Sequence, residues 1–114
     1  MFTKNKPVVQ SASIGAENTY TSALQLDTGD AASILAIVPA AFTGTLRLER
    51  SFDEVNYYPL TYVNGTKITW AVAAAAADTV VNTSFIAEEK CFIRLGCATG
   101  AYTSGTATAR IGRS

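Results

Sequence analysis

Short runs of alternating apolar and polar residues follow one another along nearly the whole chain. These runs are VVQSASI (8–14), TSALQL (21–26), GTLRLER (44–50), TVVNTSFIA (79–87), CFIRLGC (91–97) and SGTATARIG (104–112). A period of two places successive side chains on opposite faces of a strand. Turn residues separate the runs at the spacing that is typical of a sandwich or barrel. The pattern therefore predicts an all-β fold: a single antiparallel β-sandwich of about eight strands, jelly-roll or immunoglobulin-like, with no substantial helix.

Two segments depart from this alternation. SILAIV (33–38) is apolar at both parities, which predicts a strand that is covered on both faces and ends at Pro39. The alanine-rich AVAAAAAD (71–78) favours helix by propensity, but it is shorter than the roughly 12 residues that an isolated helix requires. We therefore expect a loop there, or at most one helical turn.

The clearest predicted hairpin is YYPLTYVNGTKITWAV (57–72), in which Asn64-Gly65 supplies the two positive-φ positions of a type I′ turn. Such a turn fixes the register of the two strands, so Pro59 is expected to pair with Trp70. In this hairpin and in the other strands, the alternate residues that face inward form the expected core. Its members are Leu46, Leu48, Ile68, Trp70, Val81, Phe85, Ile93 and Leu95.

Composition limits the partners and the compartment. The 114 residues are 48% hydrophobic and 16% charged, and nine basic residues balance nine acidic ones. Zero net charge gives no general attraction to nucleic acid or to an anionic membrane, so neither is expected as a partner. No segment resembles a signal peptide or approaches the roughly 18 apolar residues of a membrane span, which predicts a protein made in a cytoplasm. We divide the chain into an N-terminal arm, residues 1–7, and a sandwich domain, residues 8–114.

Catalysis is not expected from this set of residues. The chain contains no His, which removes the usual general base near neutral pH and the commonest metal ligand. Its carboxylates fall in predicted turns, where they are usually solvated. Cys91 and Cys97 lie about 20 Å apart along one predicted strand, beyond disulfide reach, so free buried thiols are expected. The sequence therefore predicts no enzyme activity, no cofactor and no metal site.

The stretch SFDEVNYY (51–58) resembles a degenerate Asp-box, the turn motif of sialidases and propellers. Ser51 and Asp53 match the motif, whereas Val55 stands in place of its Gly and Tyr58 in place of its Trp. In the motif, the Ser and Asp side chains bind turn amides and the aromatic ring packs beneath the turn. We interpret the stretch as a structural turn, like Asn64-Gly65.

Two longer segments, FTGTLRLERSFDEVNYYPL (42–60) and CFIRLGCATGAYTSGTATARIG (91–112), resemble a family of small tailed-bacteriophage virion proteins. The matching positions are Phe42, Gly44, Thr45, Leu48, Arg50, Ser51, Phe52, Asp53, Tyr57, Pro59, Arg94, Leu95, Cys97, Ser104, Gly105 and Thr106. The turn lacks the Gly and Trp that are usual in this family. The resemblance implies a β-sandwich decoration or accessory protein that is located in the virion. Its implied partners are the major capsid protein or other virion proteins, and further copies of itself.

Three functions from different classes remain open. The first is a capsid decoration or cement protein that stabilises the head shell. The second is a tail, neck or fibre component, with a host surface glycan as its ligand. The third is a non-viral carbohydrate-binding or adhesion domain. Sugar binding, where it occurs, is expected to use Tyr57, Tyr58 and Tyr62 as an aromatic platform.

Assembly is expected under the first two functions. The terminal strand SGTATARIG is interpreted as an exposed sheet edge that only Arg110 protects, so other chains are its expected neighbours. Pro7 biases the N-terminal arm toward an extended conformation that can order on a neighbouring subunit. The candidate assembly contacts are Phe2, Lys4, Lys6, Tyr57, Tyr62 and Arg110.

Overall fold

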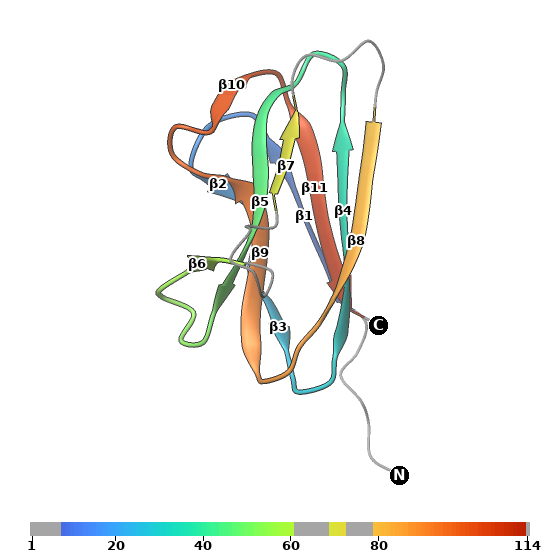
Figure 1. Ribbon diagram of the computed structural model, residues 1–114, viewed down its shortest axis with the longest axis vertical. Helices are drawn as coiled ribbons and strands as arrows, with labels where there is room; N and C mark the ends of the chain where they lie inside the picture. Colours follow the sequence, from blue (N-terminus) through green and yellow to red (C-terminus); the bar gives the residue numbers. More distant parts are fainter. Residues whose placement is uncertain (1–7, 61–68, 73–78, 114) are drawn as a thin grey trace.

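Two antiparallel β-sheets pack face to face in the structure, a computed structural model that describes residues 8–60, 69–72 and 79–113 (Figure 1). These residues contain no helix, so the predicted all-β sandwich is confirmed. The strands are β1 (Val8–Ile14), β2 (Thr19–Tyr20), β3 (Leu24–Leu26), β4 (Ala31–Val38), β5 (Thr43–Ser51), β6 (Tyr58–Pro59), β7 (Thr69–Val72), β8 (Thr79–Ile86), β9 (Cys91–Cys97), β10 (Tyr102–Ser104) and β11 (Ala107–Arg113).

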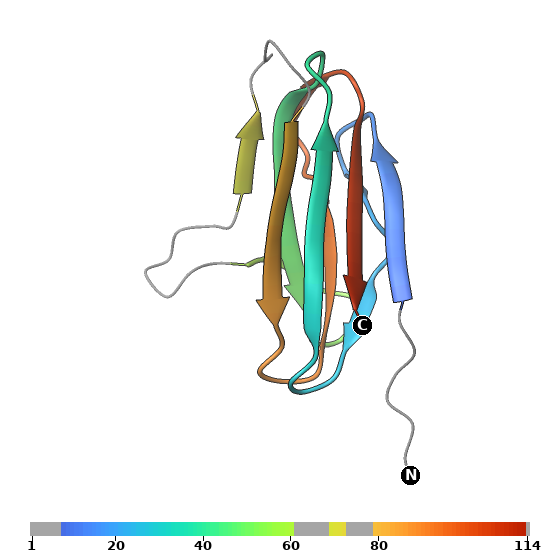
Figure 2. The same ribbon diagram turned by 90° about the vertical axis from the view of Figure 1, so that its right-hand side faces the viewer.

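Sheet A consists of β1, β11, β4 and β8 in that spatial order, and Figure 2 shows it face-on. Its strands follow the period of two closely. In β4, Ala32, Ile34, Ala36 and Val38 are buried, and the residues between them are exposed or partly exposed. One face of sheet A therefore covers the core, and the other face points away from it.

Sheet B is centred on β5 and β9, which pair with each other. β9 also pairs with β2 and β3, and β5 also pairs with β6, β7 and β10. The register between the two central strands sets Leu48 opposite Leu95 and Glu49 opposite Arg94. Because side chains alternate between faces, the leucines face the core while the charged pair lies on the outside of the sheet.

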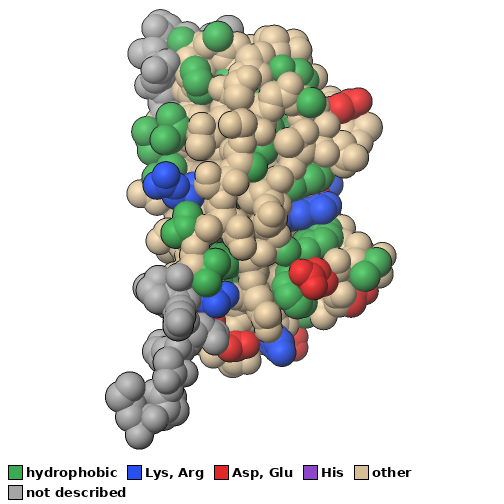
Figure 3. Space-filling model, turned by 180° about the vertical axis from the view of Figure 1, so that it is seen from behind, with side chains coloured by type: hydrophobic (Ala, Val, Ile, Leu, Met, Phe, Trp, Pro, Cys, Tyr) green, Lys and Arg blue, Asp and Glu red, His purple; other side chains and the backbone are tan. Residues whose placement is uncertain are grey.

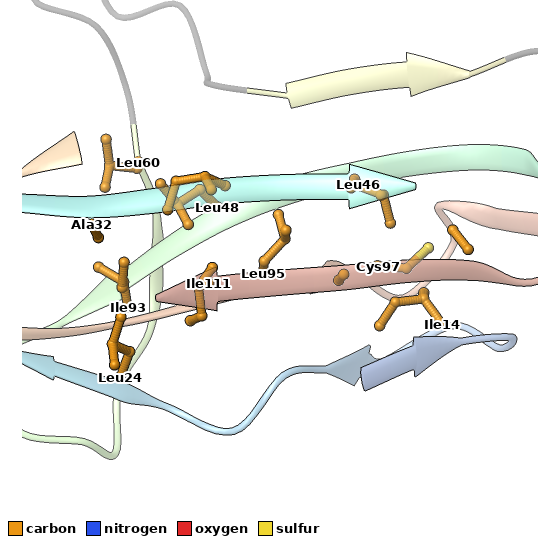
Figure 4. Close-up of a cluster of buried hydrophobic side chains, with 14 of the residues drawn as sticks. Ile14, Leu24, Ala32, Leu46, Leu48, Leu60, Ile93, Leu95, Cys97 and Ile111 are labelled. Carbon is orange, nitrogen blue, oxygen red and sulfur yellow. The ribbon is translucent and has the colours of Figure 1, made fainter. Parts of the chain in front are cut away.

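The hydrophobic core fills the space between the two sheets (Figure 4). Four residues predicted to form it are exposed by 1% or less: Leu46, Leu48, Ile93 and Leu95. Phe85 is partly buried and packs against this cluster. The side chains of Ile68, Trp70 and Val81 lie outside what the structure describes.

Cys91 and Cys97 are buried and free, as predicted. Both belong to β9 and face the core. Burial raises the pKa of each thiol, which keeps it in the poorly nucleophilic protonated form.

The expectation that SILAIV is covered on both faces is wrong. Ser33 is exposed, Leu35 is partly exposed and Ile37 is 41% exposed, because this two-layer sandwich covers only the inner face of β4. The apolar residues at the second parity of β4 therefore lie on the outer face of sheet A.

The terminal strand is not a sheet edge, contrary to prediction. β11 lies between β1 and β4, and both edges of β11 are paired. The edges of sheet A are β1 and β8. Gly105, which was expected within this strand, precedes it at φ +82°, where an added Cβ would meet the Ala41 carbonyl oxygen at 2.6 Å.

The predicted pairing of Pro59 with Trp70 is also wrong. Pro59 pairs with Glu49, and Trp70 pairs with Leu46, so β6 and β7 both run antiparallel to β5. The Asn64-Gly65 turn itself lies outside the described residues.

We expect Leu95→Ala to lower the free energy of unfolding by about 2 to 5 kcal/mol, since it removes buried methyl groups and leaves a cavity at the sheet interface. Val55→Ala, at a position 77% exposed, is the control and should change it by less than about 0.5 kcal/mol. Urea denaturation followed by fluorescence or circular dichroism measures both. Equal effects of the two substitutions would contradict this core.

Candidate functional site

A buried carboxylate with two arginine partners lies on the outer face of sheet B. Glu49 is only 1% exposed, although it faces away from the core. The Arg47 side chain donates from Nε to Glu49 Oε2 at 2.6 Å, and its Nη2 also contacts that oxygen. Arg94 donates to Oε1 from Nε at 2.8 Å and from Nη2 at 2.7 Å. Each carboxylate oxygen thus has its own guanidinium.

Two tyrosine rings complete this cluster. The guanidinium carbon of Arg94 lies 3.8 Å from the centroid of the Tyr20 ring and 3.9 Å from that of Tyr57. The Tyr20 hydroxyl donates to Glu49 Oε2 at 3.3 Å. Burial raises the pKa of Tyr20, and the neighbouring Glu49 carboxylate adds to the effect. We call these five residues, Tyr20, Arg47, Glu49, Tyr57 and Arg94, the Glu49 cluster.

Strand register and one glycine place the members of the cluster. Arg47 and Glu49 share one parity of β5, and Arg94 lies opposite Glu49 on β9. Gly96 pairs with Tyr20 of β2. A Cβ on Gly96 would lie 2.1 Å from the Thr19 carbonyl oxygen, so only glycine lets β2 approach closely enough for the Tyr20 ring to reach Arg94.

The contacts within the Glu49 cluster join the strands and the turn that carry its five residues. Its carboxylate oxygens already accept four contacts from two arginines and one from a tyrosine hydroxyl. Figure 3 shows Lys or Arg and hydrophobic side chains together in a hollow between two protruding loops, on the sheet B side of the molecule. The burial of Glu49 was not predicted from the sequence. Two features of the sequence could have indicated it. An arginine and a glutamate stand two residues apart, and so on the same face of one strand, and a further arginine stands in a second apolar strand.

The turn after β5 is held by side chains of Ser51 and Asp53. Ser51 Oγ accepts the Glu54 amide at 2.9 Å and donates to Asp53 Oδ1 at 2.9 Å. Asp53 Oδ1 also accepts the amides of Val55 and Asn56, at 2.9 and 2.8 Å. These hydrogen bonds hold the pKa of Asp53 well below its usual range. The positive φ of the turn, 63°, falls on Glu54 and not on the Val55 that replaces the motif's Gly.

The aromatic residue of this turn differs from the one expected. Tyr58 is 61% exposed, so it is not the ring packed against the turn. Tyr57, one residue earlier, is partly buried and stacks on Arg94. The arginine offers a cationic partner for the face of the Tyr57 ring.

The outer face of sheet A is a second surface of distinctive composition. The strand registers arrange its outward-facing residues in three rows of four. The rows are Ser13, Thr108, Ile37 and Val80; Ser11, Arg110, Leu35 and Asn82; and Val9, Gly112, Ser33 and Ser84. Arg110 is the single charged residue among these twelve positions. The surface is otherwise made of small polar and aliphatic side chains.

The structure does not bring the predicted assembly contacts together. Tyr57 belongs to the sheet B side, whereas Arg110 lies on the outer face of sheet A. Phe2, Lys4, Lys6 and Tyr62 lie outside the described residues. Within the described ranges there is no group of three or more Cys, Asp or Glu placed to hold a metal ion. The same ranges contain no helix with the length and apolar character needed to cross a membrane.

We expect Glu49→Gln to lower the free energy of unfolding by about 3 to 5 kcal/mol, because it leaves two arginines without their anionic partner. Arg94→Lys should lower the free energy of unfolding by less than Glu49→Gln does, because lysine keeps the positive charge. It should still be destabilising, because lysine lacks the planar guanidinium and much of its stacking on the rings. Arg110→Gln, on the exposed face of sheet A, is the control and should change stability by less than about 0.5 kcal/mol. A Glu49→Gln protein as stable as wild type in urea would contradict the structural role of the cluster.

Asp53→Asn should lower the thermal unfolding midpoint at about pH 7, and the difference from wild type should shrink as the pH falls below about 4. The folded-state pKa of Asp53 is depressed relative to the ordinary 3.8, so its stabilisation is present above that value and is lost as the carboxylate protonates. Glu88→Gln, at an exposed position, is the control. Differential scanning calorimetry across this pH range is the measurement, and a pH-independent difference would contradict the turn assignment.

No protein-family model matches this chain, and comparisons with curated proteins and with solved structures likewise find no match.

Proposed function

We propose that this protein is a bacteriophage virion structural protein that decorates the capsid and stabilises the head shell. The observation that carries the proposal is the outer face of sheet A, with one charged residue among twelve outward positions. The segments 42–60 and 91–112, which resemble small virion proteins, support the same proposal. The partners are then the major capsid protein or other virion proteins.

The size of this face suits a component present in many copies. Four strands at about 4.8 Å spacing and seven or so residues at about 3.3 Å give roughly 450 Å² in projection. A stable interface buries about 800 Å² per partner, so a single contact through this face would be weak. On a shell with many equivalent sites, weak contacts add up, and the low charge avoids repulsion between crowded neighbours.

A second candidate is a tail, neck or fibre component that binds a host glycan. It is favoured by two exposed aromatic side chains at the turn after β5, Phe52 at 55% exposure and Tyr58 at 61%. Exposed rings can stack on sugars. This surface lies on the sheet B side, so the two candidates use different faces of the molecule.

The proposal is tested by mixing the purified protein with capsids that lack it. The measurements are the copies bound per capsid and the temperature at which the shell ruptures. Wild type should bind and raise the rupture temperature. Ile37→Glu places a charge on β4, an inner strand of the sheet A face, at a position 41% exposed, and should reduce binding by about tenfold or more.

The matched control is Val55→Glu, at a 77% exposed position on the turn, which should bind like wild type. Absence of binding, or binding without a gain in rupture temperature, would contradict the decoration function and favour the tail alternative. Loss of binding in the Val55→Glu variant alone would move the interface to the turn side.

A further inference from the structure

Strand β8 has an open edge. It pairs along its whole length with β4, and in the described part of the chain no strand pairs with its other edge (Figure 2). Its sequence, TVVNTSFI, contains neither a charged residue nor a proline. Soluble proteins usually protect edge strands with such residues, because an open ladder pairs readily with another strand.

The exposed side chains of β8 are arranged symmetrically about Thr83. Val80 and Ile86 are 60% and 65% exposed, and they lie three residues on either side of Thr83. Asn82 and Ser84, next to the centre, are exposed as well. Thr83 is also exposed, although its parity faces the inside of the sandwich. The middle of this strand is therefore accessible from both faces.

We propose that β8 pairs antiparallel with β8 of a second copy of this chain, about a twofold axis at Thr83. Directly opposed residues in an antiparallel pair share a face. In this register Val80 lies opposite Ile86 of the second copy, and Asn82 lies opposite Ser84. The two exposed aliphatic side chains then cover each other twice, and no like charges meet.

Neighbouring registers fit less well. A shift by two residues sets Val80 opposite Ser84, or Ile86 opposite Asn82, and leaves each aliphatic side chain against a polar one. A shift by one residue would place outward side chains opposite inward ones, which a continuous sheet does not allow. The register centred on Thr83 is therefore selected by the side chains themselves.

The other edge of sheet A provides the comparison. β1 also lacks charge, but its outward residues are Val9, Ser11 and Ser13, so self-pairing about Ser11 would set Val9 against a serine. Pairing through β8 joins two copies of sheet A into one continuous eight-stranded sheet. This inference does not depend on the proposed function, because it concerns the isolated chain.

Sedimentation equilibrium of the intact chain at about 100 µM tests the pairing without any capsid. Wild type should show twice the mass of one chain. Val80→Lys with Ile86→Lys sets like charges opposite each other at both ends of the pair, and should raise the dimer dissociation constant by about tenfold or more. Val80→Lys with Ile86→Glu sets opposite charges there and should restore the dimer. Val9→Lys, at a position also 60% exposed, is the matched control and should leave the dimer unchanged.

A monomeric wild type would overturn the proposal, and so would a Lys/Lys variant that dimerises like wild type. A Lys/Glu variant as weak as the Lys/Lys variant would overturn the register. If a variant fails to give the wild-type circular dichroism spectrum, hydrogen exchange on the wild type decides. The amides of residues 79–86 should then exchange more slowly at high concentration than at low, and exchange independent of concentration would overturn the pairing.

Discussion

The burial of the Glu49 carboxylate on the outside of sheet B is the constraint on which much of the structure depends. Removing a carboxylate from water costs several kcal/mol unless opposite charges and hydrogen bonds replace its hydration. Arg47 and Arg94 supply the charges, and Tyr20 supplies a further hydrogen bond. Tyr57 covers the remaining face of Arg94. Five side chains from β2, β5, β9 and the turn after β5 must therefore converge.

This convergence also positions the loops on the sheet B side. The turn held by Ser51 and Asp53 brings Tyr57 back over the sheet, and Gly96 lets β2 approach closely enough to bring Tyr20 from the other side. Polar groups on this side are thus largely engaged with each other. Sheet A differs, because the twelve outward positions of its outer face include a single charged residue, Arg110. The proposed contacts with other proteins fall on that face for this reason.

Local pattern predicted those parts of the fold that depend on strand parity. Leu46 and Leu48 on β5, and Ile93 and Leu95 on β9, were placed in the core because an alternating strand puts every second residue on one face. Ser51 and Asp53 were recognised as turn residues because their short side chains reach nearby amides. These inferences require only residues close in sequence.

Inferences that need the order of strands in space failed. The sequence of β11 does not indicate that β1 and β4 take both its edges, and the residues around Trp70 do not indicate that it pairs with Leu46 of β5. Likewise, the burial of Glu49 involves Arg94, which is 45 residues later and lies opposite it, and Tyr20, which comes from β2. Contacts of this kind arise from tertiary packing, which a strand's own pattern does not encode.

The outer faces of the two sheets are proposed to have different roles: side chains on the outside of sheet B bind one another, whereas the outer face of sheet A contacts the capsid. Hydroxyl-radical footprinting of the protein, free and bound to capsids that lack it, measures this most directly, because it reports the accessibility of individual side chains. Binding should protect Leu35 and Ile37 on the outer face of sheet A and leave Phe52 and Tyr58 as reactive as in the free protein. Protection of Phe52 and Tyr58 with unchanged reactivity of Leu35 and Ile37 would contradict the claim.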